Sequence, residues 1–194
     1  MIPIRKVTKK IMAEHITTFS KIHFTPLTPR QEDILIEDIA HALSLMTRAN
    51  GHFPEFYSVA QHCLDCVSVA LAEGRTDREV LACLLHDASE AYLSDITRPV
   101  KAHLTEYHSI EKVLQDAIYE KYLAGGLTDA ERETVKRVDD TCLYYEFEHF
   151  MGEKLFDVAP QIAQLPEYKV RPFREVEQVY LTMFQEVYQR LGAD

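Results

Sequence analysis

The middle of the chain reads Val80-Leu81-Ala82-Cys83-Leu84-Leu85-His86-Asp87-Ala88-Ser89-Glu90. An apolar run is followed directly by an imidazole and a carboxylate, so a buried helix would end on two polar side chains. Burying such groups is costly unless a partner compensates them, and a bound divalent cation is a usual compensator. This stretch therefore predicts a buried helix that ends at a metal site.

Start and stop signals divide most of the chain into helices. Apolar residues recur at helical spacing, and the Thr-x-x-Glu patterns at 76–79 and 128–131 are capping boxes that start helices. The expected helices cover residues 34–46, 57–73, 76–92, 103–123, 128–149 and 174–191. The expected fold class is therefore all-α.

Two segments depart from this helical pattern. Residues 16–27 alternate β-branched and aromatic residues with polar ones, which predicts a short β-hairpin or an extended arm. Prolines interrupt residues 155–172 and predict an irregular connection. A chain of 194 residues is long enough for one well-buried domain, so we expect a single domain over residues 1–194, with its core at about 34–150.

Charge and composition exclude several partners. The net charge of -10 argues against a nucleic-acid polymer or an anionic membrane, but not against a small phosphorylated substrate in a cleft with local positive charge. No apolar stretch approaches the roughly 20 residues that span a bilayer, and no apolar run follows the basic residues 1–10. Cys63 and Cys66 match C-x-x-C without a second pair, and we interpret them as small core residues. We therefore expect a cytoplasmic protein without a signal peptide.

Other polar residues accompany the pair His86 and Asp87. Glu90 follows them by four and three residues, which places it on the same side of a helix as both. His62 and Asp139 interrupt the apolar faces of two other expected helices, where an unpaired polar group is expensive. Two imidazoles and two carboxylates would neutralise a divalent ion and leave positions open for water and substrate. Such a nitrogen and oxygen set suits manganese, cobalt, iron or zinc.

The order His62, His86-Asp87, Asp139 resembles the H…HD…D signature of the HD-domain metal-dependent phosphohydrolases. Over about residues 34–145 the chain is similar to their bacterial 5'-deoxynucleotidase branch. The matching stretches are 58–62, 86–90, Asp95 with 99–101, 106–107, 110–112 and 135–139. The resemblance implies a single compact helical HD-domain bundle, completed by the helix at about 174–191, in which His62, His86, Asp87 and Asp139 bind one divalent metal ion.

The resemblance also implies roles for residues beside the metal. Glu90 and Asp95 are then the acid/base carboxylates near the attacking water, and Arg48 contacts the substrate phosphate. The chemistry agrees, because a metal lowers the pKa of bound water, a carboxylate accepts or returns its proton, and an arginine clamps phosphoryl oxygens. Which carboxylate is base and which is acid stays open, and Arg98 and Lys101 are secondary candidates for local positive charge.

The sequence also leaves alternatives at several of these positions. The deoxynucleotidases carry a tryptophan after the arginine, whereas Ala49 follows Arg48 here and the chain has no Trp, which puts the nucleoside specificity in doubt. Asp140 stands beside Asp139, and the Val-Lys-x-x-Asp spacing selects Asp139 as the ligand. Without the family pattern, Asp139 would be read as a helix-surface carboxylate and Arg48 as a solvated loop arginine.

The function expected from this pattern is a metal-dependent phosphohydrolase that removes phosphate from a nucleoside 5'-monophosphate or a similar small phosphate ester. One alternative is a phosphodiesterase or pyrophosphohydrolase of a signalling nucleotide. Another is a non-catalytic module that binds metal and nucleotide, although the extra carboxylates Glu90 and Asp95 argue against it. His103 and His108 lie about 140° apart on a helix, so we expect no second metal. A homodimer is expected by family analogy only.

Overall fold

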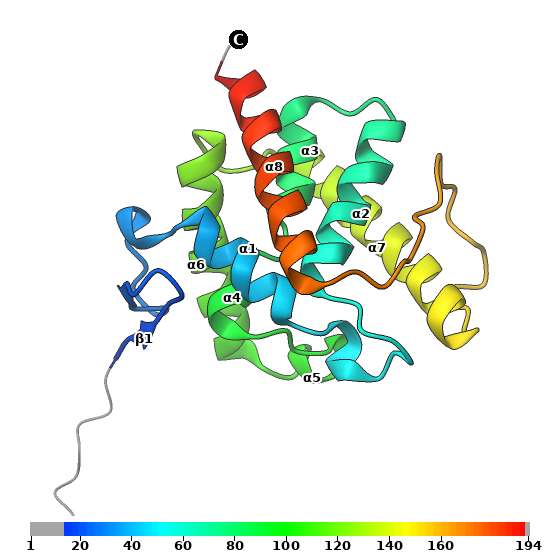
Figure 1. Ribbon diagram of the computed structural model, residues 1–194, viewed down its shortest axis with the longest axis horizontal. Coiled ribbons are helices and arrows are strands. Elements are labelled where there is room, and N and C mark those ends of the chain that lie inside the picture. The colour runs from blue at the N-terminus through cyan, green and yellow to red at the C-terminus, as the bar shows by residue number, and fades with distance from the viewer. Residues whose placement is uncertain (1–13, 193–194) are drawn as a thin grey trace, which may run out of the picture.

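Helix α3 (Asp77–Leu85) lies at the centre of the bundle. The computed structural model describes residues 14–192 (Figure 1), so the basic segment 1–10 lies outside the described residues. Every residue from Val80 to Leu85 is buried, and a helix that is apolar on all sides needs neighbours on all sides. Four long helices provide them: α2 (Val59–Ala72), α6 (Thr105–Leu123), α7 (Asp129–Met151) and α8 (Phe173–Leu191).

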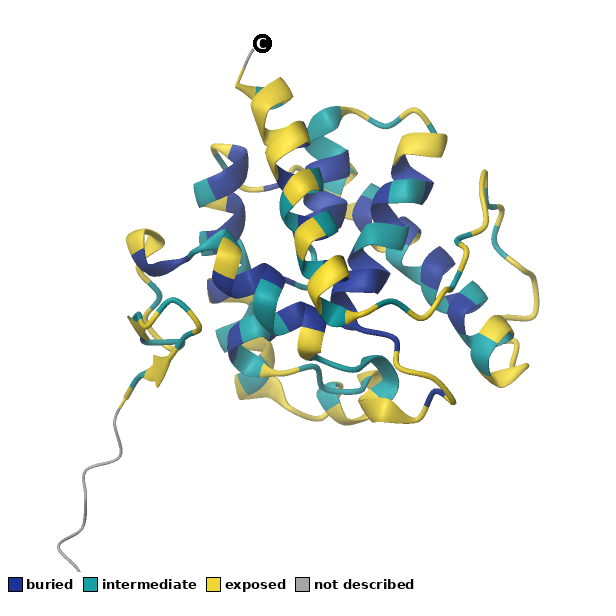
Figure 2. Cartoon of the chain, viewed as in Figure 1, coloured by how far each residue is buried: buried dark blue, intermediate teal, exposed yellow. Residues whose placement is uncertain are grey.

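Shorter elements pack against this core. Helix α1 (Ile36–Leu45) packs against α8, α2 and α4 (Glu90–Leu93), and α5 (Arg98–Lys101) packs against α6. Two 3-10 turns complete the helical elements: η1 (Gln31–Asp33) and η2 (Arg48–Gly51). Figure 2 shows the buried residues on the inner faces of the central helices and the exposed residues on their outer faces.

The N-terminal strands form the expected hairpin. Strand β1 (Ile16–Thr17) pairs antiparallel with β2 (His23–Phe24), with Ile16 opposite Phe24. The hairpin is anchored because the Phe24 ring is fully buried and stacks on Tyr92, with ring centroids 4.0 Å apart. The structure thus confirms an all-α fold with a short β-hairpin. Residues 155–172 contain no helix or strand, as predicted, and no helix within residues 14–192 is long and apolar enough to cross a membrane.

The predicted capping boxes set the starts of two helices. The Thr76 side chain accepts a hydrogen bond from the Glu79 amide and starts α3, and Thr128 does the same with Glu131 at the start of α7. In both cases the glutamate side chain in turn accepts a hydrogen bond from the threonine amide. Such a cap is worth about 1 kcal/mol, so these two helix starts are fixed by local sequence.

The prediction of one continuous helix over 76–92 is wrong. The structure divides it into α3 and α4 around a turn at residues 86–89. The cause is Gln115 of α6, whose side-chain oxygen accepts from the Ser89 amide (3.1 Å) and whose amide donates to the Leu85 carbonyl (2.8 Å). In a continuous helix those two backbone groups would bond each other.

The rest of the turn follows from this insertion. The Tyr180 hydroxyl donates to the Leu84 carbonyl (2.8 Å), and the Ala88 amide bonds the Leu85 carbonyl at 3.0 Å, three residues back instead of four. The helix therefore opens at the pair His86 and Asp87.

Removing the side-chain amide of Gln115 should destabilise the protein. In Gln115→Leu the buried Ser89 amide and the Leu85 carbonyl lose a partner, so we expect the free energy of unfolding to fall by about 1–3 kcal/mol. Gln115→Glu keeps the acceptor for Ser89 and should lose less. Urea unfolding measures both variants, and a Gln115→Leu protein as stable as the wild type would contradict this account of the turn.

Candidate metal centre

His62 is held in the first turn of α2. The Ser58 hydroxyl accepts from the Gln61 amide (3.2 Å), and the Gln61 side chain accepts from the Ser58 amide (3.3 Å), which makes a third capping box. The Thr47 backbone pairs with Ser58 and joins this helix start to the segment before Arg48. The His62 side chain is fully buried beside the end of α3.

The four side chains predicted to bind metal converge on one point. His62 Nε2 lies 3.2 Å from His86 Nε2, 3.1 Å from Asp139 Oδ1 and 3.8 Å from Asp87 Oδ2. His86 Nε2 is 3.3 Å from Asp87 Oδ2 and 3.8 Å from Asp139 Oδ1. These residues come from α2, from the turn after α3 and from α7, so the bundle itself assembles the cluster. Their role as ligands remains a prediction.

The other ring nitrogen of each histidine is held by an acceptor. His86 Nδ1 lies 2.8 Å from the Cys83 carbonyl oxygen, and His62 Nδ1 lies 2.5 Å from Glu146 Oε1. A histidine that holds a proton on Nδ1 leaves the lone pair of Nε2 free for a cation. Both rings therefore direct Nε2 toward the cluster.

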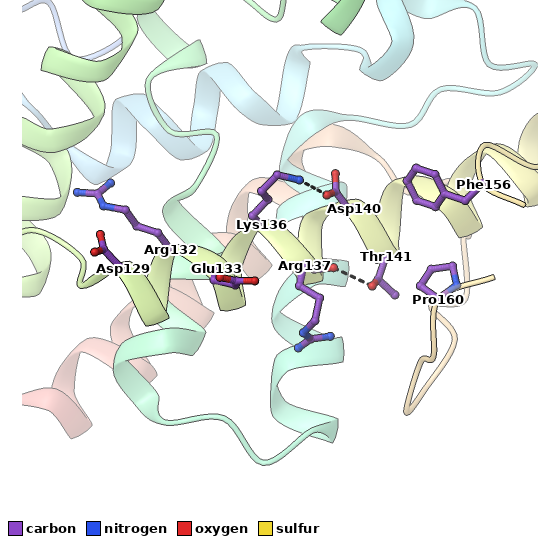
Figure 3. A pocket seen from close by; sticks show the side chains of 9 residues that line it. All are labelled: Asp129, Arg132, Glu133, Lys136, Arg137, Asp140, Thr141, Phe156 and Pro160. Atoms are coloured by element: carbon purple, nitrogen blue, oxygen red, sulfur yellow. Dashed lines mark hydrogen bonds and ion pairs between the residues drawn. The ribbon is translucent and has the colours of Figure 1, made fainter. Parts of the chain in front are cut away.

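The structure also distinguishes Asp139 from its neighbour Asp140. Asp139 Oδ1 faces the histidines while its Oδ2 accepts from Arg98 at 2.7 Å. Asp140 turns away from the cluster and pairs with Arg98 (2.7 Å) and Lys136. Together with the exposed residues Lys136 and Arg137, Asp140 lines a separate outer cavity of about 560 Å³, and Figure 3 shows Asp140 beside Lys136. Of the two residues, Asp139 is the one in the cluster.

Arg48 reaches into the cluster instead of the solvent. Its amide bonds the Tyr57 carbonyl (2.9 Å), which holds η2 beside the start of α2. Its Nη2 lies 3.2 Å from His62 Nε2, and its Nη1 lies 3.4 Å from Asp87 Oδ2. The side chain is only 11% exposed. The interpretation of Arg48 as a solvated loop arginine is therefore excluded.

Glu90 and Asp95 line a cavity of about 430 Å³ together with Asp87, Asp139 and Arg48. Glu90 Oε2 is buried and has no hydrogen-bond partner among residues 14–192, while its Oε1 lies 3.6 Å from Lys101 Nζ. The same cavity has a basic edge and an apolar wall. Its basic residues are Arg48, Arg98 and Lys101, and its apolar residues are Ala49, Phe53, Ile96, Pro99, Leu143, Phe147 and Leu155.

The electrostatic environment separates the carboxylates into two kinds. Burial opposes ionisation of Asp87 and Asp139, but the neighbouring imidazoles hold the pKa of both carboxyls well below the usual range. Burial, reinforced by the charges of Asp87 and Asp95, raises the pKa of Glu90 well above the usual value. Burial also raises the pKa of Asp95. The cluster thus places two carboxyls with a lowered pKa beside one with a raised pKa.

Two cysteines lie close to the same histidines. The groups His62, Cys66, His86 and Cys63, His86, Asp87 each bring candidate ligand atoms within 4.8 Å of one another, so either can hold a metal ion. Both cysteines are buried and free, as expected of core residues. Burial raises the pKa of the Cys66 thiol well above its usual value, which disfavours the thiolate that a metal needs.

Sequence reasoning missed Glu146 and Gln115. Glu146 follows Asp139 by seven residues, close to two helical turns, so both lie on one face of α7. That spacing was a usable signal. No comparable local signal marks Gln115. His103 and His108, which the sequence placed outside the cluster, are exposed.

Comparison with known proteins identifies relatives but no activity. No family model matches the chain. It is 40% identical to the uncharacterized protein YfdR of Escherichia coli over 124 residues, which cover 64% of this chain and 65% of that relative. It is 35% identical to the uncharacterized protein RCAP_rcc00048 of Rhodobacter capsulatus over 132 residues, which cover 65% of this chain and 67% of that relative. The match to the Escherichia coli protein therefore spans just under two thirds of its length.

Removing the Arg48 guanidinium should strengthen cation binding. In Arg48→Ala a positive charge within about 4 Å of the ligand atoms is lost, so we expect Mn²⁺ to bind at least about tenfold more tightly. Titration calorimetry measures this affinity, with Arg137→Ala on the outer face of α7 as the control. Unchanged or weaker Mn²⁺ binding in Arg48→Ala would show that the guanidinium does not compete with a cation.

Proposed function

The chain belongs to the same family as the Rhodobacter capsulatus protein RCAP_rcc00048, which is uncharacterized, so we propose a function from the site itself. The protein is a metal-dependent phosphohydrolase of the HD-domain type that acts on a nucleoside 5'-monophosphate or a similar small phosphate ester. The observation that carries the proposal is the convergence of His62, His86, Asp87 and Asp139 beside a cavity that holds two further carboxylates.

The donor set fits one divalent cation. The distances from the two imidazole nitrogens to the carboxylate oxygens of Asp87 and Asp139 lie between 3.1 and 3.8 Å. These four atoms are close enough to share one ion after small side-chain shifts. Their combined charge balances a divalent ion, and the mixture of nitrogen and oxygen ligands suits manganese, cobalt, iron or zinc. The group that contains Cys66 suits a cation less well, because burial raises the pKa of that thiol.

When bound, the cation would lower the pKa of a water and supply a nucleophile for hydrolysis at neutral pH. Glu90, which is buried and has a raised pKa, is the group that can donate a proton to the leaving oxygen. Asp95, half-buried and less displaced in its pKa, is the group that can accept one. This pair of unlike carboxyls supports acid–base chemistry, which a module that only binds metal does not need.

The cavity supports a phosphate ester with an apolar portion. Arg48 and Lys101 lie on its basic edge and can neutralise phosphoryl oxygens, because guanidinium and ammonium groups are strong donors to such oxygens. The rings of Phe53 and Phe147 meet edge to face, with their centroids 5.3 Å apart, and provide an aromatic wall for a nucleobase. Ala49, where the deoxynucleotidases carry tryptophan, leaves this wall less restrictive. A cytoplasmic location fits the four free cysteines.

The ligand assignment is tested by paired variants. Metal-free protein reloaded with Mn²⁺ or Co²⁺ should release phosphate from one or more ribo- or deoxyribonucleoside 5'-monophosphates. Asp87→Ala and Asp139→Ala should lower kcat/KM by about a thousandfold or more, because each removes a ligand. Asp140→Ala is the matched control, since Asp140 faces the outer cavity, and it should retain most activity.

Full activity in Asp139→Ala, or its loss in Asp140→Ala alone, would overturn the assignment. A wild-type protein that binds metal but releases no phosphate from any monophosphate would direct attention to diester or diphosphate substrates. A protein that binds nucleotide with metal and turns over none of these substrates would be a binding module.

Glu90→Gln separates catalysis from metal binding. The amide keeps the shape of the side chain but cannot donate the carboxyl proton, so kcat should fall by about 10²–10⁴-fold. Because Glu90 is outside the ligand set, Mn²⁺ affinity should stay close to that of the wild type. Steady-state kinetics and calorimetry on the same preparation measure the two effects, and equal kcat values would remove Glu90 from the acid–base pair.

A further inference from the structure

We propose that Glu146 is a positioning residue of the metal centre, which holds the proton of His62 on Nδ1 and so directs Nε2 to the cation. The inference rests on the proposed metal-binding function and adds a residue that neither the sequence pattern nor the relatives assign. Glu146 is fully buried on α7, as is His62 on α2. A buried carboxylate is costly, so its contacts indicate what it is retained for.

The contact behind the His62 ring places a proton on Nδ1. A carboxylate only accepts hydrogen bonds, and Glu146 Oε1 lies 2.5 Å from Nδ1. On the other side of the ring, Nε2 lies 3.2 Å from Arg48 Nη2 and 3.1 Å from Asp139 Oδ1. With its Nδ1 proton held by Glu146, the ring would offer a cation the lone pair of Nε2, on the side that faces His86 and Asp139.

The other neighbours of Glu146 leave its carboxylate committed to His62. The Tyr57 hydroxyl lies 2.6 Å from Asp65 Oδ2 and 3.2 Å from Glu146 Oε1, so its single proton is closer to Asp65. Glu146 Oε2 has no hydrogen-bond partner in the part of the chain that the structure describes, and Arg48 Nη2 is 3.6 Å away. The short contact to His62 Nδ1 is the closest that this carboxylate makes.

His86 provides an internal comparison. Its Nδ1 is held by the Cys83 carbonyl oxygen at 2.8 Å, a neutral backbone acceptor within its own helix. His62 lies near the start of α2, where the backbone three or four residues earlier belongs to the cap, and its acceptor comes from α7 instead. Both histidines thus need an acceptor behind the ring, and a neutral acceptor suffices for His86.

This comparison separates positioning from simple charge balance. If Glu146 positions His62 by accepting a hydrogen bond, Glu146→Gln should largely preserve cation binding, because a side-chain amide oxygen can accept from Nδ1. Glu146→Leu provides no acceptor, so its Co²⁺ affinity should fall by about 10–100-fold. If Glu146 only balanced the charge of Arg48 or of the cation, both variants would lose affinity equally.

The experiment uses the full chain, loaded with Co²⁺ in competition with a chelator. Rescue by Gln but not by Leu, together with a changed visible absorption spectrum of the Co²⁺ form in Glu146→Leu, is the expected result. Tyr57→Phe removes the neighbouring hydroxyl and keeps the acceptor, so its affinity and spectrum should match those of the wild type. Circular dichroism of the metal-free proteins checks that each variant is folded.

Three outcomes decide the matter. Wild-type affinity in Glu146→Leu, or equal losses in both Glu146 variants, would overturn the positioning role while leaving the proposed metal site intact. If Glu146→Leu does not fold, Glu146→Gln carries the test: its Co²⁺ absorption spectrum must match that of the wild type, and a changed spectrum would overturn the positioning role. A wild-type protein that binds no divalent cation would overturn both the metal site and the role of Glu146.

Discussion

The structure depends on how a group of charged and polar side chains is compensated inside the bundle. Asp87, Asp139 and Glu146 bring three carboxylates close to two imidazoles, and Arg48 brings one positive charge. A group of this kind is unfavourable in a protein interior unless charges and hydrogen bonds are matched. Arg48 matches part of the negative charge, and a divalent cation is the further partner that we propose for this group.

The opened turn after α3 allows the side chains of the cluster to meet. Neighbouring residues in a helix point about 100° apart, which would direct His86 and Asp87 to different sides. In the turn their side chains approach to 3.3 Å. Gln115 holds this turn open by taking the place of a helical hydrogen bond, so a residue of α6, itself outside the cluster, shapes the centre. The geometry of the site is thus produced by packing between helices.

The cavity beside the cluster is lined by two kinds of side chain. Carboxylates and basic groups make up one part of the lining, and Phe53, Phe147 and other apolar side chains make up the other. This combination suits a molecule with a charged portion and an apolar portion, which is why we propose a nucleotide rather than inorganic phosphate. The buried carboxyl of Glu90, without a hydrogen-bond partner among the described residues, belongs to the polar part of the lining.

The sequence by itself determined the all-α class, the approximate extent of the long helices, and the caps at Thr76 and Thr128. These properties follow from interactions within one or two helical turns, which spacing and residue type record directly. The side chains that meet in the cluster were predicted from the order of His62, His86-Asp87 and Asp139 along the chain. The sequence failed at the break after α3, because the amide that opens that helix comes from Gln115, on another helix.

Only the tertiary structure decided which groups stand around the ligands. It placed the Arg48 guanidinium 3.4 Å from the Asp87 carboxylate, and it placed Glu146 behind His62. It also separated Asp139 from Asp140 by the direction each takes from α7. The contacts that Arg48 and Glu146 make join residues far apart in the chain, and such contacts form only because burying the apolar faces of the helices brings those residues together.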